Sequence, residues 1–257
     1  MTNVILRTEN LCRRFGKFPA VENLSLEIYS GDIYGFLGLN GAGKTTTIRM
    51  LLRLIKPDSG KIFIHGKEIS NSYLEIMHYV GGLVEIPAFY PYLSARQNLL
   101  LLTRLRMVTS KSFINSIVDN LLSAVGLKAR ANDKIRAYSQ GMRQRLGIAA
   151  ALLPAFIQIK NPDYSPLIIL DEPTNGLDPQ GIADIRNLIK KLNKEQNVTF
   201  FISSHLLSEM ELLCNRVGIL RNGKLVISEE LRKLLKEEGV EITTPKRPLE
   251  KYFMGLV

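Results

Sequence analysis

The stretch Gly38-Leu-Asn-Gly-Ala-Gly-Lys44-Thr45 decides the fold. It fits the pattern G-x-x-x-x-G-K-S/T, it follows the apolar run 32–38, and it precedes helical spacing over 45–54. In this order of strand, loop and helix, glycines let backbone N–H groups turn toward phosphate oxygens, and the helix N-terminus adds partial positive charge. The stretch therefore predicts a nucleoside triphosphate site on an α/β fold.

The residues of this phosphate loop, 38–45, have separate expected roles. Lys44 should reach the β- and γ-phosphates, and the Thr45 hydroxyl should ligate Mg²⁺. GTPases, kinases, helicases and transporters all use such a loop, so the loop alone does not choose among these classes. The nucleotide-binding residues predicted here are Gly38, Asn40, Gly41, Ala42, Gly43, Lys44, Thr45 and Thr46.

Two acidic residues follow a second short apolar run. Leu167-Ile-Ile-Leu170 has the character of a buried strand, and Asp171 and Glu172 come directly after it. Such a strand would put Asp171 beside the magnesium ion and Glu172 where it can polarise a water for attack on the γ-phosphorus. Alone, the run fits a strand with a polar turn equally well. The phosphate loop upstream favours the catalytic interpretation.

The length and composition of the chain limit the classes of protein to which it can belong. The chain has 257 residues, 46% of them hydrophobic, which allows one large domain or a domain with a small appendage. The two cysteines show neither a disulfide framework nor zinc-site spacing, so we expect reduced thiols. We find no signal peptide and no run of about 20 apolar residues, which predicts a soluble chain.

The positive charge is concentrated in one segment. The formal net charge is +10, and residues 87–154 hold ten Lys or Arg against two Asp. Three interpretations of this segment stay open: a solvated helical face, attraction to anionic lipid or an acidic partner, and attraction to nucleic acid.

Strands and helices alternate on both sides of a segment that is helical throughout. Strands are expected within 3–28, with a turn at Gly16-Lys17, and over 61–64, 79–84, 167–170 and 198–203. Leu-rich helical periods fill 94–153, and Asn222-Gly223 predicts a hairpin turn between 217–220 and 225–227. A helix is expected over 229–238. This order predicts an α/β P-loop ATPase core, a mixed sheet with flanking helices and an N-terminal antiparallel β region, with an inserted helical subdomain.

The remaining motifs resemble those of one family. Tyr138-Ser139-Gln140-Gly141-Met142 resembles the L-S-G-G-Q signature of ABC-transporter ATP-binding subunits, and Asn175-Gly-Leu-Asp178 resembles their D-loop. His205, after the strand 200–204, is similar to the switch histidine, and Phe15 to the adenine-stacking aromatic. The resemblance covers residues 3 to about 228, and its motifs come in the family's order.

The resemblance implies a separate role for each group of these residues. Glu172, His205 and Lys44 would be catalytic, with ATP and Mg²⁺ as cofactors and Thr45, Asp171 and Glu85 near the metal. A second subunit, identical or a close paralogue, would supply Ser139, Gly141 and Asp178 to the nucleotide. Phe15 would stack on adenine, although a core aromatic is an equally good interpretation.

The family also implies domains, partners and a location. The core would comprise 1–86 and 155–228, the helical subdomain 87–154, and a short helical tail 229–257. A separate transmembrane permease would dock near Phe89, Tyr90, Tyr92 and Leu93, although a plain core cluster explains these residues nearly as well. The protein would work at the cytoplasmic face of the membrane, with no nucleic acid expected.

Three departures from the family pattern stand out. Glu85 occupies the place of the Q-loop glutamine, which resembles the E-loop of ATPases that protect bacteria against lantibiotics and bacitracin. Gln140 and Met142 replace Gly and Gln in the signature. Residues 154–166 make a longer link than usual, which we interpret as a surface loop.

Longer runs are similar to the bacitracin-resistance ATPases, namely 31–38, 45–52, 201–205 and 249–253. Transport of an antimicrobial peptide is therefore implied by resemblance. The alternative is a non-transport ABC ATPase acting on nucleic acid or ribosomes. The short spacing between the phosphate loop and the signature motif, and the presence of a single cassette in the chain, argue against it. A degenerate regulatory subunit is a third option, which the intact Lys44, Asp171, Glu172 and His205 disfavour.

Overall fold

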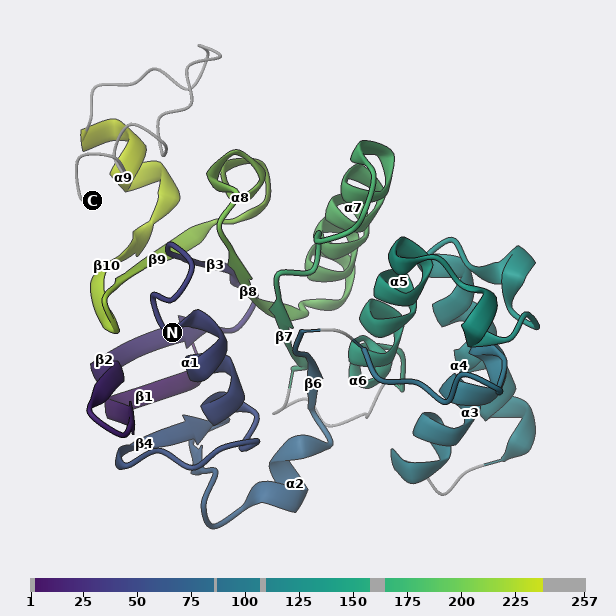
Figure 1. Ribbon diagram of the computed structural model, residues 1–257, viewed down its shortest axis with the longest axis horizontal. Helices are drawn as coiled ribbons and strands as arrows, with labels where there is room; N and C mark the ends of the chain where they lie inside the picture. Colours follow the sequence, from purple (N-terminus) through teal and green to yellow (C-terminus); the bar gives the residue numbers. More distant parts are fainter. Residues whose placement is uncertain (1–2, 86, 107–109, 158–164, 238–257) are drawn as a thin grey trace. The chain divides into compact units, whose positions relative to one another are not determined.

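The computed structural model describes residues 3–85, 87–106, 110–157 and 165–237 (Figure 1). The chain divides into two compact units, and each is described by itself. The first unit comprises residues 1–73 and 199–257, and the second comprises residues 74–198. The predicted domain boundaries, with a core of 1–86 and 155–228 and a helical subdomain of 87–154, stay a prediction.

An antiparallel sheet forms the N-terminal part of the first unit (Figure 1). Its strand order is β2 (Phe18–Tyr29), β1 (Val4–Phe15), β4 (Ser59–Ile64) and β5 (Lys67–Glu68). Along the second half of β2, buried Leu24, Leu26 and Ile28 alternate with exposed residues, because successive side chains of a strand point to opposite faces. One face of this sheet therefore contributes to the core.

The second sheet of this unit carries the phosphate loop. Here β3 (Ile33–Leu37) pairs in parallel with β8 (Thr199–Ser204) and β9 (Arg216–Arg221), and β10 (Lys224–Glu230) pairs antiparallel with β9. Every residue of β3 and β8 is buried, as expected of parallel strands covered on both faces. The helices of the unit are α1 (Lys44–Leu51), α8 (Leu207–Leu213) and α9 (Leu231–Glu237).

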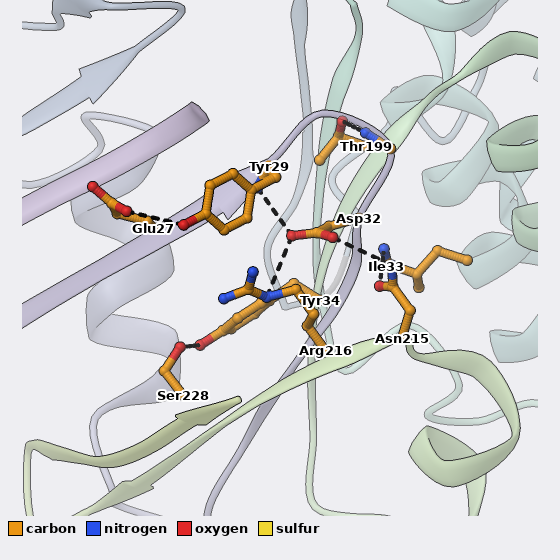
Figure 2. A network of polar contacts seen from close by, with 10 residues as sticks. Glu27, Tyr29, Asp32, Ile33, Tyr34, Thr199, Asn215, Arg216 and Ser228 are labelled. Atoms are coloured by element: carbon orange, nitrogen blue, oxygen red, sulfur yellow. Dashed lines mark hydrogen bonds and ion pairs between the residues drawn. The ribbon is translucent and has the colours of Figure 1, made fainter. Parts of the chain in front are cut away.

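A buried polar network holds the beginning of β3 (Figure 2). The Asp32 carboxylate accepts hydrogen bonds from the Tyr29 N–H (2.9 Å) and from Asn215 Nδ2 (3.2 Å), and Asn215 Oδ1 accepts one from the Ile33 N–H (2.8 Å). The Arg216 Nε lies 3.6 Å from Asp32, and its guanidinium lies over the Tyr29 ring. Burial still raises the pKa of Asp32, because desolvation outweighs these contacts. The network ties the first residues of β3 and β9 together.

The second unit combines two parallel strands with most of the helices. Strand β6 (Val80–Leu83) pairs with β7 (Leu167–Asp171). The helices are α3 (Ala95–Arg106), α4 (Lys111–Ala124), α5 (Gln140–Ala151), α6 (Leu153–Ile157) and α7 (Pro179–Gln196), with two 3-10 turns at Lys128–Arg130 and Ile135–Ala137. A short helix, α2 (Tyr73–Met77), begins at the last residue of the first unit's N-terminal segment and continues into the second unit. Within the described ranges, no helix has the length and apolar character needed to cross a bilayer.

The fold class predicted from the sequence is confirmed, and two local predictions are wrong. Glu229 and Glu230 belong to β10, because they pair with β9, so the last helix begins at Leu231. Residues 154–157 are not a surface loop but part of α6, where Pro154 is buried near the helix start, a position that tolerates proline. Residues 158–164, and the tail from 238 onward with the run 249–253, lie outside the described residues.

Gly81 offers a test of the packing of the second unit. A Cβ at this position would lie 1.8 Å from the Ala151 carbonyl oxygen, so Gly81→Ala should lower the free energy of unfolding by at least about 3 kcal/mol. Gly66→Ala is the control, since a Cβ there meets nothing within 4 Å and only its positive φ opposes the change, at a cost of about 1 kcal/mol. Urea unfolding followed by circular dichroism measures both, and equal midpoints would contradict the packing described.

Candidate functional site

The phosphate loop leaves β3 at Gly38 and enters α1 at Lys44. Its shape requires Gly43, whose φ is 106° and whose Cβ, if present, would lie 2.3 Å from the Ala20 carbonyl oxygen. The β9–β10 turn stabilises the loop, because the Gly223 N–H in that turn donates a hydrogen bond of 2.9 Å to the Ala42 carbonyl. Asn40 and Gly41, at the tip, are exposed. The predicted strand–loop–helix arrangement is thus present.

Lys44 and the start of α1 have the chemistry of an anion site. The Lys44 side chain is only 6% exposed, and its Nζ donates to the carbonyl oxygens of Gly38 (2.7 Å) and Leu39 (3.2 Å). The N-cap residue Gly43 has no side chain that could accept from the N–H groups of the first turn. A phosphate group supplies such acceptors, and the half-buried Thr45 and Thr46 lie in that same turn. The loop therefore fits a phosphate.

His205 reaches this region through the register of the sheet. Leu37, the last residue of β3, is paired with Ser204, the last residue of β8. The phosphate loop and His205 therefore leave neighbouring parallel strands at the same edge. The Ser204 hydroxyl accepts a hydrogen bond of 2.9 Å from the Leu206 N–H and shapes the turn that presents the exposed His205.

Phe15 is not a core residue. Its side chain is 48% exposed at the end of β1, and the Arg13 guanidinium lies 5.0 Å from its ring centroid. This exposure excludes the interpretation of Phe15 as a core aromatic, and adenine stacking stays a prediction. A pocket of about 460 Å³, within the size range of small-molecule sites, is lined by Phe18, by the loop residues 39–42 and by the hairpin residues 219–222 and Val226.

The predicted acidic residues of the second unit also lie at strand ends. Leu83 is paired with Leu170, so Asp171 ends β7 and Glu172 follows it, while Glu85 follows the neighbouring strand β6. Asp171 is 3% exposed, whereas Glu85 is exposed. Glu85 and Glu172 have φ values of 55° and 46°, in the left-handed region of backbone conformation. Most of the other non-glycine residues with positive φ in the described chain are Asn or His, which adopt this conformation more readily. Such backbone strain costs about 1–3 kcal/mol and clusters at functional sites.

The signature segment is joined to the turn after β7. Ser139 is the N-cap of α5, and its hydroxyl accepts a hydrogen bond of 3.3 Å from the Met142 N–H. A Cβ on Gly141 would lie 3.0 Å from the Gly176 carbonyl oxygen, so the helix start approaches the 172–178 segment closely. Ser139 and Gly141 thus lie at a helix N-terminus, as predicted.

Gln144 is a residue that the sequence analysis missed. It is buried, and its Nε2 donates to the carbonyl oxygens of Glu172 (3.4 Å) and Pro173 (3.1 Å). It therefore holds the turn at Glu172 against the signature helix. The sequence did offer a signal for Gln144: it is a polar residue on the same helix face as Gly141, one turn before it, and the apolar Ile148, one turn after it.

Asp178 lies at the beginning of α7. Its carboxylate accepts a hydrogen bond of 2.8 Å from the Gly181 N–H, which makes it the N-cap of that helix. The residue is exposed, so the cap leaves part of the carboxylate open to solvent. Its predicted contact with nucleotide stays a prediction.

Comparison with known proteins identifies the family. The family profile described as "ABC transporter" matches residues 21–175. The chain is 48% identical to the bacitracin transport ATP-binding protein BcrA of Bacillus licheniformis, over 87% of this chain and 69% of that protein. It is 37% identical to the lantibiotic transport ATP-binding protein SrtF of Streptococcus pyogenes, over 88% of this chain and 91% of that protein.

Solved structures agree with this assignment. The ATP-binding subunit of an ABC transporter matches with a TM-score of 0.82 and 25% identity, over 98% of this chain and 99% of that one. A dimeric ATP-binding cassette in a post-hydrolysis state with ADP and Pi matches with a TM-score of 0.79 and 25% identity, over 89% of this chain and 99% of that one. The chain therefore belongs to the ABC transporter family, as one of its ATP-binding and ATP-hydrolysing subunits.

Proposed function

We propose that two such subunits, identical or closely paralogous, pair head to tail around ATP and drive a separate membrane permease. The observation that supports this most is that one chain carries two helix starts whose chemistry suits an anion. These are the phosphate loop at α1 and the Ser139–Gly141 segment at α5. In the proposed pair, the Ser139 segment of one subunit closes on the triphosphate held by the Lys44 loop of the other.

The residues of the phosphate loop would hold and orient the triphosphate. The backbone N–H groups of 40–45 and the Lys44 ammonium carry the charge complementary to the β- and γ-phosphates, and Phe15 offers an exposed ring face to adenine. Ser139 and Gly141 of the second subunit would add donors to the γ-phosphate, with Asp178 beside them. This enclosure would position the phosphorus for in-line attack.

Magnesium fits the residues proposed to hold it. The Thr45 hydroxyl and the Asp171 carboxylate are hard oxygen donors of the kind that Mg²⁺ takes in phosphate sites, and the exposed Glu85 carboxylate is a further candidate. When bound, the ion would neutralise charge on the β- and γ-phosphate oxygens. Glu172 would accept a proton from the attacking water, and His205 would hold the γ-phosphate and that water.

The partner and cargo follow from the family and from the names of the relatives. Because BcrA and SrtF are named as transport proteins for bacitracin and for a lantibiotic, we propose a permease that moves an antimicrobial peptide. The subunit would act at the cytoplasmic face of the membrane, and no nucleic acid partner is proposed. Tyr90 and Tyr92 are exposed rather than part of a core, which supports docking near 89–93.

Glu172→Gln tests the proposed chemistry. The amide keeps the side-chain shape but cannot accept a proton, so ATP hydrolysis should fall by about 100-fold or more while ATP still joins the subunits. Phosphate release gives the rate, and size-exclusion chromatography with light scattering gives the subunit state with and without ATP.

Glu195→Gln, an exposed acid on α7, is the matched control and should behave as the unmodified chain. Hydrolysis at an unchanged rate in Glu172→Gln would remove Glu172 from the reaction. A chain that stays monomeric with ATP in every variant would contradict the paired arrangement.

Glu85→Gln tests the role of the acid in the Q-loop position. We expect that losing this charge changes how strongly the permease stimulates ATP hydrolysis, with a smaller effect on hydrolysis by the isolated subunit. The measurements are ATPase rates in proteoliposomes and growth on the antimicrobial peptide. Glu75→Gln, an exposed acid of α2, serves as control. Unchanged behaviour of Glu85→Gln in both assays would discard the idea.

A further inference from the structure

The β1–β2 hairpin, which carries Phe15, touches the phosphate loop through its second strand. In the register of the hairpin, Arg13 on β1 is paired with Val21 on β2. A Cβ on Gly43 would lie 2.3 Å from the Ala20 carbonyl oxygen and 3.4 Å from Val21 Cγ2. The Phe15 ring therefore belongs to a pair of strands that packs against the loop proposed to hold the triphosphate.

Packing alone does not fix the Phe15 ring. Residues 14–18, at the tip of the hairpin, are all exposed. The Arg13 guanidinium lies over the Phe15 ring, 5.0 Å from its centroid. A cation over the face of an aromatic ring is attracted by the electron density of that face, so Arg13 restrains the orientation of the ring. With Arg13 on one face, the opposite face is the one on which a base can stack.

Arg13 is itself held by the segment that follows α1. Its Nη1 donates to Asp58 Oδ1 (2.7 Å) and to the Lys56 carbonyl (3.2 Å). The second carboxylate oxygen of Asp58 accepts a hydrogen bond from the Arg14 N–H (2.7 Å), and the Asp58 N–H donates to the Cys12 carbonyl (2.9 Å). Asp58 thus contacts three successive residues of β1 and fixes the strand just before Phe15.

One nitrogen of the Arg13 guanidinium is not used by Asp58. Within the described ranges of the chain, the Arg13 Nε is buried and has no hydrogen-bond acceptor. Leaving a buried N–H without an acceptor costs free energy, and the π face of the Phe15 ring offers partial compensation. The guanidinium thus links two groups, with Nη1 on the Asp58 carboxylate and Cζ over the Phe15 ring.

We propose that Arg13, held by Asp58, is a positioning residue for the base of the nucleotide. It keeps the Phe15 ring in one orientation before the nucleotide arrives, and this preorganisation lowers the entropic cost of stacking a base. The inference rests on the proposed function, in which Phe15 stacks on adenine and the phosphate loop holds the triphosphate. Arg13 therefore contributes to affinity for the base and leaves both phosphate binding and the chemical step unchanged.

Competition between two ligands separates the base from the phosphates. Displacement of a fluorescent ATP analogue from the full chain gives the affinities of ATP and of inorganic tripolyphosphate, which has no base. Arg13→Gln should weaken ATP binding about fivefold, as the loss of one cation–π contact provides, and should leave tripolyphosphate binding unchanged. The kcat for ATP hydrolysis should stay within about twofold, because the lost contact is to the base and not to the γ-phosphate.

Two further variants and one control complete the comparison. Arg13→Lys keeps a cation for the ring and the carboxylate and should retain most of the ATP affinity, whereas Asp58→Asn breaks the ion pair and should weaken ATP binding. Arg7→Gln is the matched control, because Arg7 lies on the same strand with its guanidinium 4.5 Å from the centroid of the Phe63 ring. It should bind both ligands as the unmodified chain does.

A double-mutant cycle shows whether Arg13 acts through Phe15. If it does, Arg13→Gln should weaken ATP binding no further in a chain that already carries Phe15→Ala. Fully additive losses would overturn the inference, because Arg13 would then act independently of the ring. Equal losses of ATP and tripolyphosphate affinity in Arg13→Gln would also overturn it, since they would reflect general positive charge or a disturbed phosphate loop.

Phe15→Ala alone keeps this inference apart from the proposed function. Weaker ATP binding in Phe15→Ala, together with unchanged ATP binding in Arg13→Gln, would refute only the positioning role of Arg13. Unchanged ATP binding in Phe15→Ala would refute adenine stacking itself and the inference with it.

Discussion

The parallel pairing of β3 with β8 places the phosphate loop and His205 at one edge of a sheet. Leu37 and Ser204 are partners, and each is the last residue of its strand. A shift of one residue would turn the side chains of β3 to the opposite face and move the loop by about 3.3 Å along the sheet. The same arrangement recurs in the second unit, where Leu83 and Leu170 are partners ahead of Glu85 and Asp171. The proposed chemistry depends on these two registers.

The opposite end of β3 is where its register is anchored. Asp32, Asn215 and Arg216 form the buried network of Figure 2, and the Thr199 hydroxyl accepts a hydrogen bond of 2.9 Å from the Gly31 N–H. The network thus connects the beginnings of β3, β8 and β9. Because a buried charge gives little net stability, geometry explains the role of this network better than energy does. We interpret it as a structural device that keeps the distant phosphate loop in register.

The sequence predicted the features that arise from local chemistry. The phosphate loop was readable because glycine at Gly43 allows a backbone that other residues avoid, and the β9–β10 turn because Asn222-Gly223 favours positive φ at both residues. The acids at the end of β7 were readable because a short apolar run ending in Asp-Glu, in a chain that also carries a phosphate loop, is typical of a strand that leads into a nucleotide site. These positions make up most of the candidate site and establish the fold class.

The sequence did not predict contacts between segments. Gln144 reaches carbonyls near Glu172, and residues 90–96 pair with 131–136, but a side chain that bonds to a distant backbone leaves no periodic trace in the sequence. Glu229 and Glu230 are good helix formers, and their pairing with β9 overrides that propensity. The burial of Pro154 in α6 was missed because proline is usually a sign of a loop.

The proposed function depends on a site made by two chains, with Lys44 from one and Ser139 from the other. Mixing two inactive variants tests this directly: Lys44→Ala loses the ammonium, and Ser139→Asp keeps an N-cap but brings a negative charge to the triphosphate. A mixed pair has one site with both defects and one site with none. The amplitude of single-turnover phosphate release from an equal mixture should therefore recover to roughly a quarter of the unmodified amplitude, because half of the pairs are mixed and each has one intact site of two. No recovery, with each variant folded and able to pair, would contradict a shared site.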